Sequence, residues 1–268
     1  MKILDYAVAR KLGIAFSGGA PSLTTKLIAQ KLGGGSGGES GGNTGGGSGS
    51  GGGTLPDKNT WEGVFARMDA GTYATDYAIG DTVPLDLGSE GVINMQIAAF
   101  DADDLADGTG KAKISWVSKE LVGEHRINPY LSGTTEGTGT IGGWGSCELR
   151  TYLKDTIKPL IADTVASRIA TVTKTQRAYN TDVSQVTQTT EDDVWIPDYN
   201  EVFSSGIYTG LFVDNASRIK LARSGSAYYW WTRFAHTREK AICVGKDGAW
   251  QSAYTYEPYG IALGFCTN

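Results

Sequence analysis

The segment from Gly33 to Gly53 contains only glycine, serine and a few other polar residues, with no apolar side chain. Such a segment buries too little surface to offset the entropy lost when its backbone becomes ordered, so we expect a flexible linker. A Gly/Ser chain of about 21 residues has a root-mean-square span of roughly 25 Å. The irregular interruptions at Glu39-Ser40 and Asn43-Thr44 favour a natural linker over an engineered one. We therefore divide the chain into residues 1–32, a linker at 33–56 and a folded domain at 57–268.

Two short amphipathic helices are expected before the linker. Both have apolar residues at helical spacing, Leu4, Val8 and Leu12 in the first and Leu23, Leu27, Ile28 and Leu32 in the second. Helices of about three turns are marginal alone in water, so their apolar stripes need a surface to pack on. We expect residues 1–32 to form a docking segment that packs on a larger assembly or on copies of itself. A frayed tail is the alternative.

The overall composition limits the classes of partner. With 40% hydrophobic residues among 268, the chain can bury a substantial core. Its net charge is -5 and its Lys and Arg residues are scattered, so it lacks the basic surface that binds nucleic acid, and no nucleic-acid partner is expected. No apolar run approaches the roughly 20 residues of a transmembrane helix, so we expect no membrane insertion.

The cysteines and histidines do not form a recognisable site. Cys147, Cys243 and Cys266 are too few and too far apart for a disulfide scaffold or a zinc knuckle. His125 and His236 are also far apart and lack the spacing of paired metal ligands. We therefore expect reduced cysteines, no metal and no cofactor.

The domain after the linker begins with predicted strands and continues with predicted helices. Alternating apolar residues and a run rich in β-branched residues indicate the strands, at Ile93, Met95, Ile97 and Ala99 and then in "AKISWVSKELV". Helical spacing indicates a first helix and, after Pro159, a second: Leu149, Leu153 and Ile157, then Ile161, Val165 and Ile169.

Short apolar segments between Gly, Asp and Ser turns complete the domain. We expect short strands in "DDVWIPDYNEVF", "SAYYWWTRF", "KAICVGKDGAW" and "GIALGFC". The run Lys246-Asp247-Gly248 predicts a hairpin turn because Asp-Gly tolerates positive φ. Strands, then helices, then short strands indicate an α+β fold.

No catalytic motif is evident in the sequence. "GGWGSCE" is not a nucleophile elbow, since Glu148 occupies the position of the second glycine. "DADDLADGTG" departs from a calcium loop at Leu105 and Ala112, which occupy ligand positions. We expect the protein not to be an enzyme.

Aromatic residues are concentrated near the C-terminus: Tyr228, Tyr229, Trp230, Trp231, Phe234, Trp250, Tyr254, Tyr256 and Tyr259. Such residues dominate both cores and binding surfaces. We expect Trp230 and Trp231 in the core. We expect Tyr254 and Tyr256 at the surface, because they have no apolar neighbours and Pro258 breaks the strand.

Several blocks in order carry a family resemblance: "WVSKELVGEHRINPYL", "TEGTGTIGGWGSCELRTYL", "TVTKTQ", "DDVWIPDYNEVF", "YYWWTR", "DGAW" and "YGIALGFC". Over roughly residues 76–268 the chain resembles the phage-type branch of the domain-of-unknown-function family numbered 6273. The resemblance implies a C-type-lectin-like fold and a location on a phage particle. The Gly-rich first quarter lies outside it.

The C-terminal part also resembles variable proteins diversified by retroelements, in which fixed W-W-x-R and G-x-A-L-G-F-C motifs bracket a varied segment. The matching fixed residues are Trp230, Trp231 and Arg233, then Gly260, Ala262, Leu263, Gly264, Phe265 and Cys266. Thr232 replaces the usual leucine. With Trp250 added from the aromatic concentration, the implied ligand-binding residues are Phe234, His236, Thr237, Arg238, Glu239, Lys246, Trp250, Gln251, Tyr254, Tyr256 and Glu257.

The expected function is that of a virion adhesin, a fibre, tail or head-decoration protein. The lectin-like domain would bind a host cell-surface protein or glycan, while residues 1–32 would dock on a capsid or tail protein. A homotrimer is expected by analogy with phage fibres. The first alternative is a structural decoration protein without a specific ligand. The second is an oxidase using Cys243 and Cys266, since formylglycine-generating oxidases share the lectin-like fold class.

Overall fold

The computed structural model describes residues 55–129, 139–180, 184–203 and 206–268, and these belong to the unit Gly53–Asn268. The predictions made for residues 1–32 and for 33–54 lie outside the described residues. Helices and antiparallel sheets occur together in the described part, so the fold is of the α+β type.

The first sheet packs its strands in the order β1-β2-β3-β14-β5, and all its pairs are antiparallel. Alternation on β2 buries Ile93, Met95 and Ile97, as the sequence predicts. The strands are β1 (Thr82–Asp86), β2 (Val92–Phe100), β3 (Ile114–Ser118), β5 (Ile169–Ala170) and β14 (Gly264–Thr267). The β2 and β3 predictions are thus confirmed.

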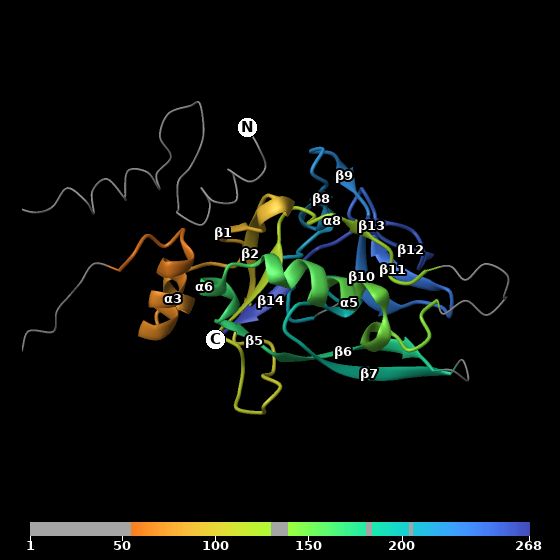
Figure 1. The fold of residues 1–268 in the computed structure, drawn as a ribbon, viewed down its shortest axis with the longest axis horizontal. Helices are drawn as coiled ribbons and strands as arrows, with labels where there is room; N and C mark the ends of the chain where they lie inside the picture. The colour runs from red at the N-terminus through yellow and green to blue at the C-terminus, as the bar shows by residue number, and fades with distance from the viewer. Residues whose placement is uncertain (1–54, 130–138, 181–183, 204–205) are drawn as a thin grey trace, which may run out of the picture. The chain divides into compact units, whose positions relative to one another are not determined.

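The second sheet has the order β12-β11-β10-β13-β4, with β12 at an edge (Figure 1). Its strands are β4 (Glu124–His125), β10 (Trp230–Ala235), β11 (Lys240–Val244), β12 (Trp250–Tyr254) and β13 (Tyr259–Gly260). The predicted hairpin turn at Lys246-Asp247-Gly248 joins β11 to β12, with Gly248 at φ 76°.

The two sheets are joined at the C-terminal end of the chain. Residues 261–263 pass from β13 to β14 and are fully buried. Beside them, Trp195 exchanges two backbone hydrogen bonds with Gly264. A β-carbon at Gly264 would lie 2.2 Å from the Trp195 ring, so only glycine allows this approach.

Four tryptophans, Trp116, Trp195, Trp230 and Trp231, are fully buried in the core. Trp230 and Trp231 lie on adjacent positions of β10, and both faces of this central strand are covered. The prediction that this pair belongs to the core is confirmed.

Helix α3 and the helical segment from η2 to α6 contribute buried residues to this core, among them Val64, Met68, Leu149 and Leu153. Thr60 caps α3 by accepting a hydrogen bond from the Gly63 N–H. The helical elements are α3 (Trp61–Ala70), α4 (Tyr73–Asp76), η1 (Gly88–Glu90), η2 (Trp144–Ser146), α5 (Glu148–Tyr152), the π-helical η3 (Leu153–Ile157), η4 (Lys158–Leu160), α6 (Asp163–Ala166), α7 (Tyr199–Phe203) and α8 (Asn215–Arg218).

Two sequence predictions about these segments need correction. Of the second predicted helix only α6 (Asp163–Ala166) forms, so Ile161 lies before it, and Ile169 instead begins β5, where it pairs with Thr267. The segment "DDVWIPDYNEVF" was expected to be a strand but ends in α7. Pro197 lacks a backbone N–H, and Asp198 accepts from the Asn200 N–H, so the chain turns there into a helix.

The long hairpin of β6 (Val172–Tyr179) and β7 (Gln185–Asp192) was not predicted (Figure 1). Every second residue of β6 is buried, but two of these four residues are polar: Val172, Lys174, Gln176 and Ala178. Because Lys174 and Gln176 are polar, β6 lacks the alternation of apolar and polar residues by which a strand is recognised. A short ladder of β8 (Lys220–Leu221) and β9 (Ala227–Tyr228) completes the sheets.

Candidate functional site

Four rings gather on the outer side of β10, β11 and β12, and we call them the aromatic face: Tyr199, Phe234, His236 and Trp250. The Tyr199 ring lies 5.2 Å from Phe234 and 6.4 Å from Trp250, and His236 lies 5.9 Å from Trp250. Trp250 is 50% exposed, whereas Phe234 is half-buried. The aromatic face therefore has one large exposed ring, Trp250, next to rings that are packed against the rest of the domain.

The base of the aromatic face is held by an arginine from the β6–β7 hairpin. The Arg177 guanidinium lies 5.3 Å from the Phe234 ring centre and donates to the His236 carbonyl at 2.9 Å. Tyr199 comes from α7, some 35 residues before Phe234. Sequence reasoning missed both Arg177 and Tyr199 because neither lies in the C-terminal aromatic concentration.

A second aromatic pair lies at the far end of β12. The Tyr254 and Tyr256 rings stack at 5.5 Å with 13° between their planes. Lys240, which pairs with Tyr254 across β11 and β12, places its Nζ 4.6 Å from the Tyr254 ring. The predicted exposure of both tyrosines is confirmed, while their role in ligand binding stays a prediction.

The turn between β10 and β11 is fixed through its backbone. Thr140 donates its N–H to the Arg238 carbonyl at 2.8 Å and its hydroxyl to the Thr237 carbonyl at 2.7 Å. The side chains of Thr237 and Glu239 are exposed, and Arg238 is half-buried. Within the turn, the Thr237 hydroxyl accepts from the Lys240 N–H at 3.1 Å, so the turn is held both by Thr140 and by its own threonine.

The remaining predicted residues are dispersed. Lys246 contacts Tyr228 and Tyr229, with its Nζ 5.5 Å from each ring, and so lies apart from the aromatic face. Gln251 points to the side of β12 opposite Trp250, since neighbouring strand residues alternate. Glu257 is half-buried in the turn after β12. The structure therefore unites Phe234, His236 and Trp250 but not the whole predicted set.

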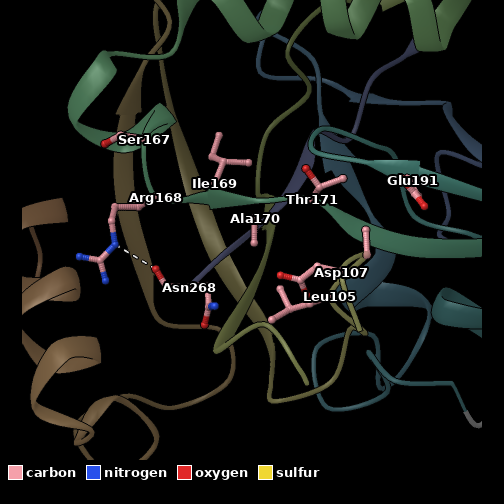
Figure 2. A pocket seen from close by; sticks show the side chains of 10 residues that line it. Leu105, Asp107, Ser167, Arg168, Ile169, Ala170, Thr171, Glu191 and Asn268 are labelled. Carbon is pink, nitrogen blue, oxygen red and sulfur yellow. Dashed lines mark hydrogen bonds between the residues drawn. The ribbon is translucent and has the colours of Figure 1, made fainter. Parts of the chain in front are cut away.

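A recess of about 550 Å³ lies elsewhere, between β5 and the C-terminal residue, and none of the predicted residues lines it (Figure 2). Its Arg168 donates to the Asn268 carbonyl at 2.9 Å and to both carboxylate oxygens of Asp69. The guanidinium is thus already engaged within the chain. Nothing in the recess points to a ligand.

The structure also brings together four charged side chains in the core, which we call the buried ionic cluster: Asp103, Lys174, Glu201 and Arg233. Lys174 Nζ lies 2.5 Å from Asp103 Oδ1 and 3.2 Å from Glu201 Oε1. Arg233 donates to both Glu201 oxygens, at 3.1 and 3.2 Å. Two cations and two anions are therefore paired with one another in the core.

Neighbouring charges keep the cluster ionised. Burial alone would raise the pKa of Asp103 and of Glu201, but Lys174 lowers the pKa of Asp103, and Arg233 together with Lys174 lowers that of Glu201. Burial alone would lower the pKa of Lys174, but Glu201 and Asp103 raise it. Because each charge has a partner, the desolvation that would neutralise an isolated group is offset.

The short helix α7 connects the cluster to the aromatic face. Glu201 points inward to Arg233 and Lys174, while Tyr199 and Phe203 of the same helix stack on each other at 5.2 Å on the outer side. On β10, Arg233 likewise points inward and Phe234 outward. The sequence gives one local signal for the cluster: charged residues within otherwise buried strand segments, such as Arg233 after Trp230 and Trp231.

The cysteines considered for oxidase chemistry lie in different sheets, Cys243 in β11 and Cys266 in β14. Both are buried free thiols. Burial raises the pKa of the Cys243 thiol to about 12 and that of Cys266 well above its usual value. Neither thiol is activated as a thiolate nucleophile.

Residues 130–266 match the family model described as Domain of unknown function (DUF6273). The chain belongs to this family. No curated protein and no solved structure matches it. The DUF6273 match begins after β1, β2 and β3, yet β3 pairs along its length with β14 of the matched region. The folded unit therefore extends further towards the N-terminus than the DUF6273 match.

Within the described ranges, no helix of this DUF6273 protein has the length and apolar character needed to cross a lipid bilayer. Among the same residues, no group of three His, Cys, Asp or Glu side chains gathers as a metal site.

Proposed function

We propose that this DUF6273 protein is a non-enzymatic phage adhesin with a C-type-lectin-like fold, which binds a bacterial surface protein or glycan through its aromatic face. The protein would be a fibre, tail or head-decoration component of the virion. The resemblance of the C-terminal motifs to phage variable proteins supports the phage assignment. The half-exposed ring of Trp250 on the edge strand β12 is the observation that supports binding.

The physical argument concerns side-chain entropy and support. Trp and Tyr offer large contact areas with few rotatable bonds, so they lose little freedom on binding. Tyr199 packs against both Phe234 and Trp250, and Arg177 donates to the His236 carbonyl, so the face is preorganised. Preorganised aromatic residues commonly act as binding hot spots.

The proposed linker at residues 33–53 would add avidity. Several copies on flexible tethers can reach separate sites on one cell, and linked binding can exceed a single contact by about 10²- to 10⁴-fold. Weak binding by each aromatic face is then sufficient for attachment.

Binding of the full chain to a glycan array and to a panel of intact bacterial cells tests the proposal. We expect Trp250→Ala to weaken binding by about 30-fold or more, as for a typical hot spot. Val92→Ala is the matched control, because Val92 is also an exposed apolar residue, at 65%, but lies on β2 of the other sheet. Equal losses in the two variants, or no binding to any cell or glycan, would favour the structural decoration protein instead.

A further inference from the structure

The buried ionic cluster places an amine directly against a carboxyl group in the core. The Lys174 and Asp103 side chains are only 1% and 2% exposed, and Nζ lies 2.5 Å from Oδ1. Glu201 lies on the other side of the amine, with Oε1 3.2 Å from the same Nζ. A nucleophile, an acyl carbon and a group that can carry protons are therefore adjacent.

The second oxygen of Asp103 is surrounded by hydrogen-bond donors. Its Oδ2 accepts from Ser115 Oγ at 2.5 Å, from Tyr208 OH at 2.7 Å and from Cys266 Sγ at 3.3 Å. Burial raises the pKa values of Tyr208 and Cys266 well above their usual values, so both keep their protons. Donors aimed at one carbonyl oxygen stabilise the negative charge that develops there during acyl transfer.

Aromatic rings close the site on the lysine side. Lys174 Nζ lies 3.7 Å from the centre of the Trp195 ring and 5.1 Å from that of Tyr208. In such a dry environment, an ion pair is costly to maintain relative to a neutral product. The pair is ionised before reaction, since each charge favours the charged form of the other, so a proton has to move from Lys174 to Asp103 before the amine can attack.

We propose that Lys174 and Asp103 form an intramolecular isopeptide bond, with Glu201 as the proton carrier. The Lys174 ammonium gives one proton to Asp103 Oδ1, and the resulting amine attacks Cγ, so that the charge develops on Oδ2. Glu201 takes a second proton from the nitrogen and passes it to the Oδ1 hydroxyl. Oδ1 then leaves as water, and one N–H remains in the new amide, so atoms and charges balance without an oxidant or co-reactant.

The product fits the charge balance of the site. Amide formation removes one cation and one anion, leaving Arg233 paired with both oxygens of Glu201. Ser115, Tyr208 and Cys266 then donate to the amide carbonyl. Within the buried ionic cluster, neither remaining charge lacks a partner.

The bond would join the loop after β2 to strand β6 across 71 residues of chain. A cross-link that closes a long loop restricts the unfolded chain in the way a disulfide does. All three cysteines are free thiols, so the isopeptide bond would supply a covalent constraint that this chain does not obtain from cysteine.

Intact mass measurement of the denatured full chain tests the proposal directly. We expect the chain to be lighter than its sequence by one water molecule, and protease digestion to yield a branched peptide joining the Asp103 and Lys174 segments. A mass equal to that of the sequence, with both segments recovered separately, would mean a simple ion pair and would overturn the proposal. This measurement needs no variant to fold.

Three variants identify the chemistry. Lys174→Arg keeps the positive charge but should remove the mass loss completely. Asp103→Asn should still react, now losing ammonia in place of water, because the leaving atom is nitrogen. Glu201→Gln should abolish or slow the reaction in the folded chain, and full linkage in Glu201→Gln would refute its role as proton carrier.

Discussion

Lys220 is a buried amine without a carboxylate partner in contact with it, and its replacement by methionine should stabilise the protein. The side chain is 2% exposed, and its ammonium donates to the Ser118 carbonyl. Its Nζ lies 5.6 Å from the ring centres of Phe212 and Trp230. Burial lowers the pKa of Lys220 from 10.5 to about 7, and the distant charge of Glu120 raises it only in part.

The magnitude follows from this pKa difference. At about 1.4 kcal/mol for each pH unit, a lysine whose pKa falls from 10.5 to about 7 opposes folding by up to roughly 5 kcal/mol when charged. Methionine has a similar length and packs well against aromatic rings. Against this gain, the Ser118 carbonyl loses its donor, at a cost of about 1–3 kcal/mol. We expect Lys220→Met to stabilise the chain by about 2 kcal/mol at pH 7.

The pH dependence provides the more specific test. Between pH 7 and 10.5 the unfolded chain binds the Lys220 proton more tightly than the folded chain, so the contribution of Lys220 makes stability rise with pH in this window. Below pH 7 both states are protonated and the penalty is complete. The advantage of Lys220→Met should therefore be greatest at or below pH 7 and should shrink as the pH approaches 10.

Urea unfolding followed by tryptophan fluorescence, at several pH values from 6 to 9.5, measures this difference. Lys154→Met is the matched control, because Lys154 is exposed on η3 and should show little change at any pH. A Lys220→Met chain that is less stable than the wild type at pH 7, or an advantage that does not depend on pH, would refute the reasoning.

Two further predictions concern the core. Gly264→Ala should destabilise the fold by at least about 3 kcal/mol, or prevent folding, because the new β-carbon would lie 2.2 Å from the Trp195 ring; thermal unfolding checks this, and a melting temperature close to that of the wild type would contradict it. Asp198 Oδ1 has no hydrogen-bond partner among the described residues, and burial raises the pKa of Asp198 to about 6. The folded state therefore holds this proton more tightly, so the Asp198 contribution to stability is lost as the pH rises from about 4 through 6. Asp198→Asn should remove that loss and stabilise the chain above pH 6 by up to about 3 kcal/mol, and an unchanged pH profile in urea unfolding would argue against it.

Local signals in the sequence were sufficient for part of the fold. Strand β2 and the hairpin turn at Lys246-Asp247-Gly248 follow from alternation and from turn chemistry, which depend only on neighbouring residues. Helix α7 could not be predicted in this way. The apolar run at residues 194–196 resembles a strand, whereas Pro197 and Asp198 start a helix directly after it. The β6–β7 hairpin was missed because Lys174 and Gln176 face the core.

Part of the candidate site could likewise be predicted from local sequence, and part could not. Exposure of Tyr254 and Tyr256 followed from the lack of apolar neighbours in their segment. The tertiary contacts of the aromatic face could not be predicted from local sequence, since Tyr199 contacts Trp250 from α7 and Arg177 contacts Phe234 from β6. The buried ionic cluster joins residues separated by up to 130 positions, and no local pattern specifies such a contact.

The aromatic face depends on the buried ionic cluster through α7. This helix has five residues, too few to be stable alone, so its position rests on its tertiary contacts. These include those of Glu201 inside the core and the hydrogen bond from Arg218 to the Val202 carbonyl at 2.9 Å. Glu201 is bound by Lys174 and Arg233, and on the same helix Tyr199 reaches Trp250 on the outside. Substitutions at Trp250 or His236 should leave the contacts of Glu201 in place, because Trp250 and His236 do not contact Glu201, Lys174 or Arg233. A change at Glu201 would instead displace Tyr199 and so alter the aromatic face, although no exposed residue is replaced. The side chains of the aromatic face can therefore vary freely only as long as the residues of the buried ionic cluster stay the same.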